Sequence, residues 1–357
     1  MSAAEQSRQA AGGREPRPEA AAAHPGALER QLSQMIVGSW VTQAIAVAAE
    51  LAVSDLLAGG PRSAEDLARE AGVHAPSLHR LLRALASAGL FAQDDGGRFA
   101  LTGLGRLLAG DAPGSKRDLA LMAGAEFYRS WGGLLGAVRT GTPAFEEVFG
   151  SPFFSYMGQH PERWRIYDAA MNGVHGAETH PVLDAYDLSA VSRLVDVGGG
   201  NGAALAEALR RHPHLEGVLY DLPDVARRAR EALAASDVAG RCSVVGGSFF
   251  DAVPPGADAY FLRHVLHDWE DEEAAAILRR CAEAMRPDGR VLVVETVIPA
   301  GDEPCFGKWL DLMMLVVGGR ERTLDQYARV FAAAGLRLER VVPTAHEVSV
   351  LEGVRAG

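Results

Sequence analysis

Hydrophobic and polar positions change their spacing along the chain, and the change predicts two kinds of architecture. Between Leu28 and about Glu50, apolar residues recur at the three- and four-residue intervals of a helix. Two shorter helices over 63–72 and 77–88 follow, and then two short strands around an Asp-Asp-Gly-Gly turn. The order helix, helix, hairpin predicts a winged-helix unit, which we place over residues 27–112.

The last part of the chain alternates between strands and helices. After each helical segment comes a short apolar run, and we expect strands near 194–197, 217–221, 242–246, 258–263 and 290–296. This alternation is typical of a parallel sheet covered by helices. Two closing strands, near 336–343 and 346–352, have no helix between them and must pair antiparallel. The pattern predicts an α/β domain over 186–357 whose antiparallel end differs from that of a dinucleotide-dependent dehydrogenase.

Residues 113–185 lie between these two parts and are predicted to be mostly helical. They are rich in aromatic side chains within about 40 residues: Phe127, Tyr128, Trp131, Phe145, Phe149, Phe153, Phe154, Tyr156, Trp164 and Tyr167. Most of these rings are expected to pack in an ordinary core. Several are also expected to line a pocket for a flat, aromatic small molecule.

Composition narrows the class of protein. Acidic residues outnumber basic ones by 46 to 35, a net charge of −11, which argues against a general affinity for nucleic acid or anionic membranes. No apolar run approaches the roughly 20 residues that span a bilayer. The three scattered cysteines fit a reduced, cytoplasmic protein. Residues 1–26 show no periodicity and no signal-peptide core, and we expect a disordered tail.

The winged-helix unit allows two interpretations. A transcription regulator would present basic residues from its second helix to DNA, and this helix offers only His79, Arg80 and Arg83. Neutralisation of DNA phosphates by basic side chains supplies most of the affinity for DNA, and this helix offers few basic side chains. We therefore favour a dimerisation platform over a DNA-binding domain.

A glycine-rich loop follows the first predicted strand of the α/β domain, in the order Val-Asp-Val-Gly-Gly-Gly-Asn-Gly over 195–202. Glycines allow a sharp turn and close approach to a ligand, and such a loop is where α/β sheets bind nucleotides. The spacing satisfies both a dinucleotide fingerprint and a pattern in which Asp196 precedes Gly198 and Gly200. An acid before the glycines suits a ligand that carries an ammonium group. With either cofactor, Asp221 at the end of the second strand is placed to bind ribose hydroxyls.

Four further motifs resemble one family when they are taken together in order. They are Tyr-Asp-Leu-Pro from 220, Gly-Gly-Ser-Phe-Phe-Asp from 246, Arg-His-Val-Leu-His-Asp-Trp from 263 and Gly-Gly-Arg-Glu-Arg-Thr from 318. The chain, over about 28–355, resembles the S-adenosylmethionine-dependent small-molecule O-methyltransferases. These include plant caffeate and flavonoid enzymes, acetylserotonin methyltransferase and bacterial antibiotic-tailoring enzymes. The resemblance implies a homodimer, a winged-helix dimerisation domain and a Rossmann-like class I methyltransferase domain with an antiparallel terminal strand.

The resemblance also implies a mechanism. His267 is the expected general base, with Glu295 and Glu321 beside it. An imidazole with a pKa near ~6.5 can accept the proton of a phenol, whose pKa is near ~10, as the oxygen attacks the methyl group. His264 is expected to lie within the strand and to take no part. Asp268 is expected to cap the following helix rather than to do chemistry.

The same resemblance assigns residues to S-adenosylmethionine. Gly198 and Gly200 lie beside its amino-acid end, and Asp221 binds its ribose. The remaining residues expected at the cofactor are Asp196 at the ammonium group, Ser248 and Phe249 at the adenine, Arg263, and, over the methionine end, Tyr156 and Met171. Ser248 departs from the family pattern, in which an aspartate stands here, so we expect weaker cofactor binding.

The sequence favours one function and leaves others open. We expect O-methylation of a hydroxyl, phenolic or enolic, on an aromatic secondary metabolite, while the acceptor itself is not predicted. The alternatives are a hydroxylase or decarboxylase of the same fold, a winged-helix DNA-binding regulator and an NAD-dependent oxidoreductase. No metal is expected, because no cluster of His, Cys and Asp residues has the spacing of metal ligands.

Overall fold

The computed structural model describes residues 25–357, so the predicted tail over 1–26 lies almost entirely outside the described residues. The predicted first helix is two helices, α2 (Pro25–Ile36) and α3 (Gly38–Glu50), which bend by 42° at Val37. No single described helix has the length and apolar character needed to cross a membrane; only α2 and α3 taken together, across their bend, would meet that test. Many apolar side chains of this pair are exposed.

The winged-helix prediction is confirmed between α3 and the connector. The unit contains α4 (Val53–Leu56), α5 (Ala64–Ala71), α6 (Ala75–Ser87), β1 (Phe91–Gln93), β2 (Phe99–Leu101) and α7 (Gly103–Arg106). The Ser63 hydroxyl caps α5 by accepting the backbone N–H of Asp66 at 3.1 Å, and Gly72 ends this helix at φ +68°. Leu67, Leu82 and Phe99 form its fully buried core.

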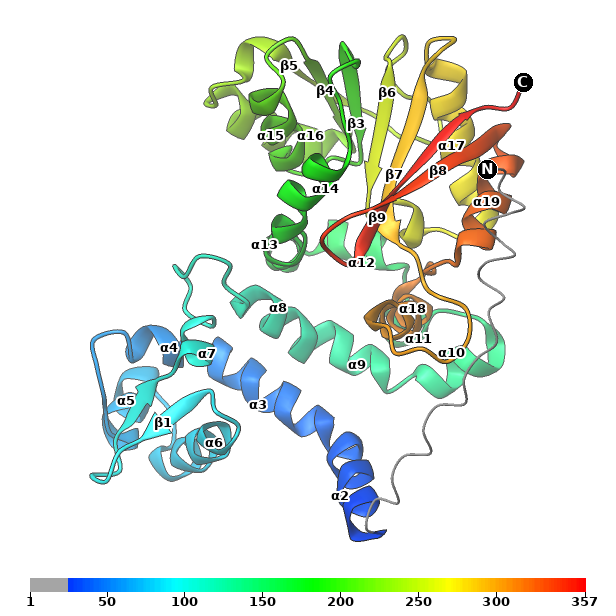
Figure 1. The fold of residues 1–357 in the computed structure, drawn as a ribbon. Coiled ribbons are helices and arrows are strands. Elements are labelled where there is room, and N and C mark those ends of the chain that lie inside the picture. Colours follow the sequence, from blue (N-terminus) through cyan, green and yellow to red (C-terminus); the bar gives the residue numbers. More distant parts are fainter. Residues whose placement is uncertain (1–24) are drawn as a thin grey trace.

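Short helices connect this unit to the sheet. They are α8 (Arg117–Met122), the π-helix η1 (Ala123–Phe127), α9 (Tyr128–Trp131), α10 (Leu134–Thr140), α11 (Ala144–Phe149), α12 (Phe153–Gln159), α13 (Pro161–His175), η2 (Gly176–Glu178) and α14 (Thr179–Ala185). Figure 1 shows the winged-helix unit at one end of the molecule, the sheet at the other, and α8 and α9 between them. The α13 helix packs on α8, and it also contacts the sheet domain, because Asn172 accepts from Asn201 and the carbonyl of His175 accepts from Arg263.

The sheet has seven strands in the order β5-β4-β3-β6-β7-β9-β8. Its parallel strands are β3 (Arg193–Val197), β4 (Glu216–Asp221), β5 (Cys242–Gly246), β6 (Ala259–Arg263) and β7 (Arg290–Thr296). As predicted, β8 (Leu336–Pro343) and β9 (Val348–Arg355) are antiparallel, and β9 pairs with β7. This is the predicted class I methyltransferase fold.

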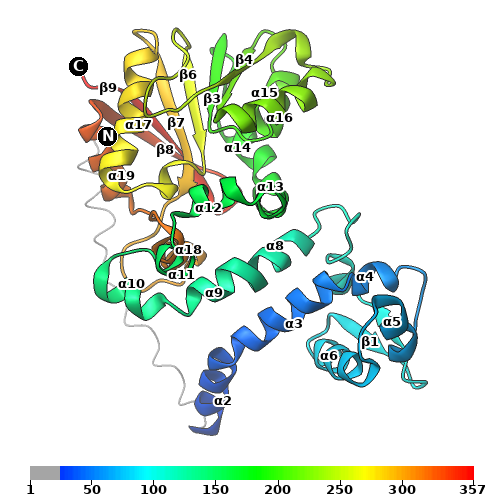
Figure 2. The same ribbon diagram turned by 180° about the vertical axis from the view of Figure 1, so that it is seen from behind.

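Helices cover both faces of the sheet, as the two views show (Figures 1 and 2). On one side lie α14, α15 (Ala203–Arg211) and α16 (Pro223–Ala234), and on the other α17 (Asp271–Ala284) and α19 (Leu324–Ala333). Neighbouring strand residues alternate between the two cores: Leu194 packs in one, and Val195 and Val197 pack in the other. The α18 helix (Phe306–Val317) leaves the sheet and packs on α10 and α11. Through α18, the sheet domain is therefore packed against the connector helices α10 and α11.

Candidate active site

A cavity of about 300 Å³ opens at the carboxyl ends of the parallel strands. The segments that follow β3, β4, β5 and β6 line it from the sheet, and α13 lines it from the connector. The β3 strand pairs with β4 on one side and with β6 on the other, so the chain order reverses here. In open α/β sheets such a switch point is where ligands bind.

The glycine loop forms one wall of the cavity, and its shape requires glycine. Gly198 and Gly200 have φ values of +72° and +58°, in the left-handed region. A Cβ on Gly198 would lie 2.7 Å from Val265 Cγ2, and one on Gly199 would lie 2.6 Å from the carboxylate of Asp196. The loop thus brings bare backbone against the cavity, as the sequence predicted.

Two carboxylates line this end of the cavity. Asp221 accepts the backbone N–H groups of Gly200 at 2.9 Å and Leu222 at 2.7 Å, and burial raises the pKa of its carboxyl to about 6. Asp196 is 2% exposed, and burial raises its pKa to about 7. Its Oδ2 is buried and has no hydrogen-bond partner among residues 25–357. A buried carboxylate oxygen without a partner fits a ligand that brings a cation, such as the ammonium group of S-adenosylmethionine.

Most of the other expected cofactor residues also reach the cavity. Ser248, Phe249, Arg263 and Met171 line it. The Arg263 guanidinium is held in place, because it donates to Thr179 Oγ1 at 2.9 Å and to the carbonyl of His175 at 3.3 Å.

Tyr156 does not line the cavity. Its ring stacks on His160 with centroids 4.0 Å apart and packs against Phe149. Because these contacts hold the ring in the connector core, the structure does not place Tyr156 over the methionine end as expected.

The aromatic segment divides as predicted into core and pocket. Phe154, Trp164 and Tyr167 line the cavity, together with Trp269 from the strand side. Phe145, Phe149 and Phe153 pack against one another instead. The cavity therefore has a polar end at the glycine loop and an aromatic end beside α12 and α13.

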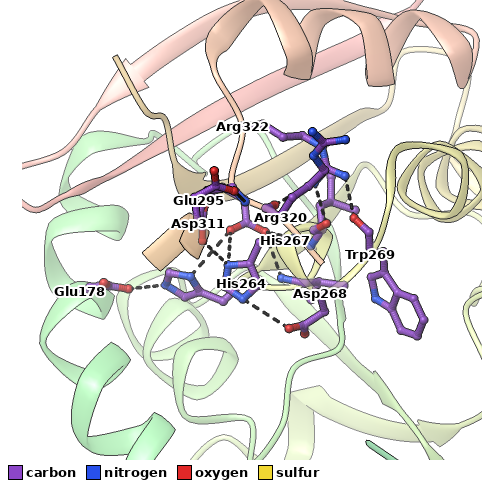
Figure 3. A network of polar contacts seen from close by, with 12 residues as sticks. Glu178, His264, His267, Asp268, Trp269, Glu295, Asp311, Arg320 and Arg322 are labelled. Atoms are coloured by element: carbon purple, nitrogen blue, oxygen red, sulfur yellow. Dashed lines mark hydrogen bonds and ion pairs between the residues drawn. The ribbon is translucent and has the colours of Figure 1, made fainter. Parts of the chain in front are cut away.

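His267 also lines the cavity, and Figure 3 shows it among its acidic neighbours Glu295 and Asp268. Its Nδ1 lies 3.1 Å from Glu295 Oε2 and 3.0 Å from Glu321 Oε1, and its Nε2 lies 3.6 Å from Asp268 Oδ1. Burial opposes the charged imidazole, but the negative charges of Glu295, Asp268 and Glu321 outweigh it and raise the pKa of His267 well above its usual value. The three residues that the sequence assigned to proton transfer are therefore brought together.

Glu295 also holds the backbone that carries His267. Its Oε1 accepts the N–H groups of Val265 at 3.1 Å, Leu266 at 2.9 Å and His267 at 3.3 Å. Burial opposes its ionisation, yet the charge of His267 and these hydrogen bonds lower the pKa of Glu295. One end of the carboxylate thus shapes the loop, and the other faces the imidazole.

A buried arginine holds the same loop from the opposite side. The Arg322 side chain is fully buried and donates to the carbonyls of Leu266 at 2.8 Å and Trp269 at 2.6 Å, and to Asp271 at 2.8 Å. The neighbouring Glu321 is placed by its own N–H, which donates to Asp311 Oδ1 at 3.0 Å. The Gly-Gly-Arg-Glu-Arg-Thr motif is thus used to position His267.

Two expectations about the neighbours of His267 are wrong. Asp268 does not cap α17; the cap is Glu270, in a capping box with Glu273. Asp268 lines the cavity instead, and burial raises its pKa to about 7. His264 does not lie within β6, which ends at Arg263. His264 is the first residue after the strand, and it also lines the cavity. Both His264 and Asp268 belong to the turn that carries His267.

The structure adds two acids that sequence reasoning missed. Asp168 on α13 lines the cavity and accepts the indole N–H of Trp164 at 3.0 Å. Glu178 in η2 is 5% exposed and contacts His264. Neither stands in a motif, and only the fold brings them to the site.

A group of possible metal ligands is also present. His264, His267 and Glu295 each offer one ligand atom, and the three atoms lie within 4.8 Å of one another. The spacing of residues along the sequence did not indicate this group, because segments that are separate in the sequence bring its members together. That no metal takes part stays a prediction.

Comparison with known proteins identifies the family. Residues 131–337 match the O-methyltransferase domain, and residues 33–111 match the O-methyltransferase dimerisation domain. The chain belongs to the O-methyltransferase family. It is 46% identical to the phenazine O-methyltransferase PhzM of Lysobacter antibioticus over 90% of this chain and 94% of that protein. This chain is therefore an S-adenosylmethionine-dependent O-methyltransferase, as predicted.

Solved structures of the family agree with this fold. The crystal structure of LaPhzM superposes with a TM-score of 0.89 at 45% identity, covering 92% of this chain and 99% of that chain. The neocarzinostatin-biosynthesis enzyme NcsB1, in complex with S-adenosylmethionine and 2-hydroxy-5-methyl naphthoic acid, has a TM-score of 0.80 at 38% identity, covering 88% and 96%.

Proposed function

We propose that this O-methyltransferase methylates a phenolic hydroxyl of an aromatic secondary metabolite, with His267 as the general base. The observation that carries the proposal is the position of His267, which faces a partly aromatic cavity while two buried carboxylates face its Nδ1. Relatives support the acceptor class, since the enzyme from Lysobacter antibioticus acts on a phenazine and NcsB1 binds a naphthoic acid.

The residues of the chain account for the proton transfer. Glu295 and Glu321 keep the remaining imidazole proton on Nδ1, so Nε2 is free to accept the proton of the acceptor hydroxyl. The electron pair of the O–H bond stays on the oxygen, which becomes the nucleophile. S-adenosylmethionine, when bound, supplies an electrophilic methyl group on a sulfonium. Phe154, Trp164 and Tyr167 would hold a flat acceptor and exclude water.

Asp196 and Asp221 are proposed to hold the two polar ends of the cofactor. Asp196 would take the ammonium group, and Asp221 would accept from the ribose hydroxyls. Ser248 and Phe249 would lie at the adenine, and Arg263 and Met171 close the remaining wall. Without a negative charge, Ser248 offers one hydroxyl where the family has a carboxylate.

The dimerisation domain is proposed to form a homodimer. Apolar side chains on α2, α3, α10 and α18 are exposed in the single chain, including Met35, Ile36, Trp40, Leu135 and Trp309. Light scattering should give twice the mass of one chain, and Trp40→Glu should shift the protein toward the monomer. A wild-type protein that is monomeric at micromolar concentration would overturn the proposal.

Transfer of a tritiated methyl group tests the reaction. The purified enzyme is incubated with labelled S-adenosylmethionine and a panel of hydroxynaphthoates, hydroxyphenazines and simple phenols, with His267→Asn as the matched control. We expect labelled methyl ethers from at least one bicyclic or tricyclic phenol and a large loss of label with the variant. Equal labelling by both proteins would contradict the assigned base.

A further inference from the structure

The aromatic end of the cavity depends on one helix, α13. Its first two turns bring Trp164 and Tyr167 to the cavity, and Phe154 of α12 lines the cavity beside them. The three rings contact one another, with centroids 6.3–6.5 Å apart. These rings are the proposed binding surface for a flat acceptor, so the placement of α13 decides the shape of that surface.

The carboxyl half of α13 is held through its backbone. The carbonyl of Gly173 accepts from Lys116 Nζ at 2.6 Å, and the carbonyl of His175 accepts from Arg263 at 3.3 Å. Both contacts lie beyond the turns that carry the two rings of α13, and those turns have a separate support.

That support is an ion pair between Arg163 and Glu126. The Nε of Arg163 donates to Glu126 Oε1 at 2.7 Å, and its Nη2 donates to Oε2 at 2.5 Å. Glu126 is 7% exposed, and Arg163 is partly buried. Two parallel hydrogen bonds to one carboxylate fix the orientation of the guanidinium as well as its distance. The pair therefore fixes the first turn of α13 relative to η1.

The η1 segment, which carries Glu126, is itself anchored on α3. Gln43 of α3 donates to the carbonyl of Gly124 at 3.2 Å, and a Cβ on Gly124 would collide with the Cβ of Ala46. The segment is π-helical, and Ala125 within it has φ −108° and ψ −105°, outside the helical range. Short π-helical turns are rare and often occur at functional sites. Here the turn brings Glu126 to α13 from a segment that packs on α3.

Stability alone explains this ion pair poorly. A buried pair loses the hydration of both charges, and apolar side chains of similar size often stabilise a fold equally well or better. The pair supplies a fixed orientation, which apolar side chains do not. Arg163 directly precedes Trp164 and lies four residues before Tyr167, so a shift of the helix at Arg163 moves both rings.

We propose that Glu126 and Arg163 are positioning residues that place Trp164 and Tyr167 against the acceptor and so set its affinity. This inference rests on the proposed function, which puts the acceptor at the aromatic end. Neither Glu126 nor Arg163 lines the cavity, so the pair acts through α13. Because η1 packs on α3, the acceptor surface is set from the dimerisation domain rather than from the sheet.

The test compares acceptor and cofactor kinetics in Arg163→Lys. Lysine keeps the positive charge but cannot make two parallel hydrogen bonds to Glu126. With the phenol of the panel that the wild type labels fastest, the KM for the acceptor should rise by about tenfold. The value of kcat should change little, because Glu295 holds His267 independently of α13. The KM for S-adenosylmethionine should also change little, because other contacts hold the carboxyl half of α13.

Two further variants separate positioning from stability. Glu126→Met/Arg163→Met replaces the pair by apolar side chains of similar length, and its melting temperature should equal or exceed that of the wild type. Its KM for the acceptor should nevertheless rise, because the fixed orientation is lost. Arg210→Lys changes a comparable but exposed pair with Asp237, and as the control it should alter neither KM. A KM does not depend on the fraction of active protein, so partial unfolding cannot mimic the rise.

The outcomes separate this inference from the proposed function. If Arg163→Lys and the double Met variant both keep the wild-type KM for the acceptor, the ion pair is only structural and the inference fails alone. The inference also fails if the KM values for acceptor and cofactor rise by the same factor, because the pair then supports all of α13. If His267→Asn stays active, the base assignment fails, while the acceptor KM of Arg163→Lys still decides the inference.

Discussion

The two ends of the cavity are built on opposite principles. At the cofactor end, one continuous segment supplies a bare backbone of glycines, and the two carboxylates of Asp196 and Asp221 face the space that the ligand fills. At the base end, the charged groups face one another: His267 contacts Glu295 and Glu321, and backbone groups occupy the second oxygen of Glu295. At the cofactor end, Asp196 Oδ2 has no hydrogen-bond partner among residues 25–357, whereas at the base end the imidazole of His267 and two carboxylates lie in contact with one another.

This difference indicates a division of labour. Groups left without partners gain their hydrogen bonds from a ligand and so contribute to affinity. Groups that are already paired keep their geometry whether or not a ligand is present, and so contribute to the rate. Mutations at the two ends should therefore separate binding from turnover.

The largest expected effect is at the base end. His267→Asn removes the proton acceptor, and turnover at saturating substrates should fall by about 10²–10⁴-fold. The affinity for S-adenosylmethionine, measured by calorimetry, should stay within a few-fold of wild type. A parallel loss of both quantities would show that the two ends are not independent.

Asp221→Ala should produce the opposite pattern. Removing a charged acceptor from the ribose should weaken S-adenosylmethionine binding by about 10- to 100-fold, while kcat at saturating cofactor changes little. Calorimetry gives the first quantity and initial rates give the second. Asp224→Ala, on the exposed first turn of α16, is the control and should alter neither. A collapse of kcat with unchanged affinity would reverse the roles of the two ends.

The contrast between the ends also explains what the sequence could predict. The glycine loop and Asp221 belong to one strand–helix–strand unit, so their spacing along the sequence predicts that they lie close together. The partners of His267 come from β7 and from the segment before α19, and only the family resemblance indicated them. Glu178 could not be predicted, because its approach to His264 depends on how the connector packs on the sheet.

Errors of prediction arose at turns, where the chain leaves regular structure. Periodicity placed the strands and most helices closely, because alternate residues must face the two cores. The strand predicted over 258–263 ends at Arg263, as β6 does, and the error was to assign His264, the residue that follows, to that strand. Periodicity also could not show that Glu270 rather than Asp268 caps α17, because both are acids before the same helix.

Cofactor binding should depend on pH at the cofactor end. Burial raises the pKa of Asp221 to about 6, so its charged form is present above that pH and is lost as the pH falls through it. The affinity for S-adenosylmethionine should therefore decrease between pH 7 and pH 5, by roughly tenfold for each unit below the pKa. Asp196, whose pKa is about 7, titrates over a similar range of pH. The pH dependence of cofactor affinity should be weaker in Asp221→Asn, and the difference from wild type gives the contribution of Asp221 alone. A flat wild-type profile would argue against a carboxylate contact with the cofactor.

Ser248→Asp should strengthen cofactor binding by a few-fold, because a charged hydrogen bond to the adenine amine is stronger than a neutral one. The Ser248 hydroxyl also accepts the N–H of Phe250 at 3.3 Å, and aspartate can replace that contact. Ser248→Ala gives the matched comparison and should bind more weakly than wild type. If the aspartate variant bound S-adenosylmethionine no better than wild type, the prediction that serine at this position weakens cofactor binding would be refuted.

A chelator should have the smallest effect, which is none. His264, His267 and Glu295 are close enough to hold an ion, but a metal on His267 Nδ1 would displace the proton that Glu295 and Glu321 retain there. It would also neutralise the charge on which the base depends. Dialysis against EDTA should therefore leave the rate unchanged, and added Zn²⁺ should inhibit rather than activate. If activity disappeared with the chelator and returned with a divalent ion, the base end would be a metal centre, and the division between a paired and an unpaired end would have to be abandoned.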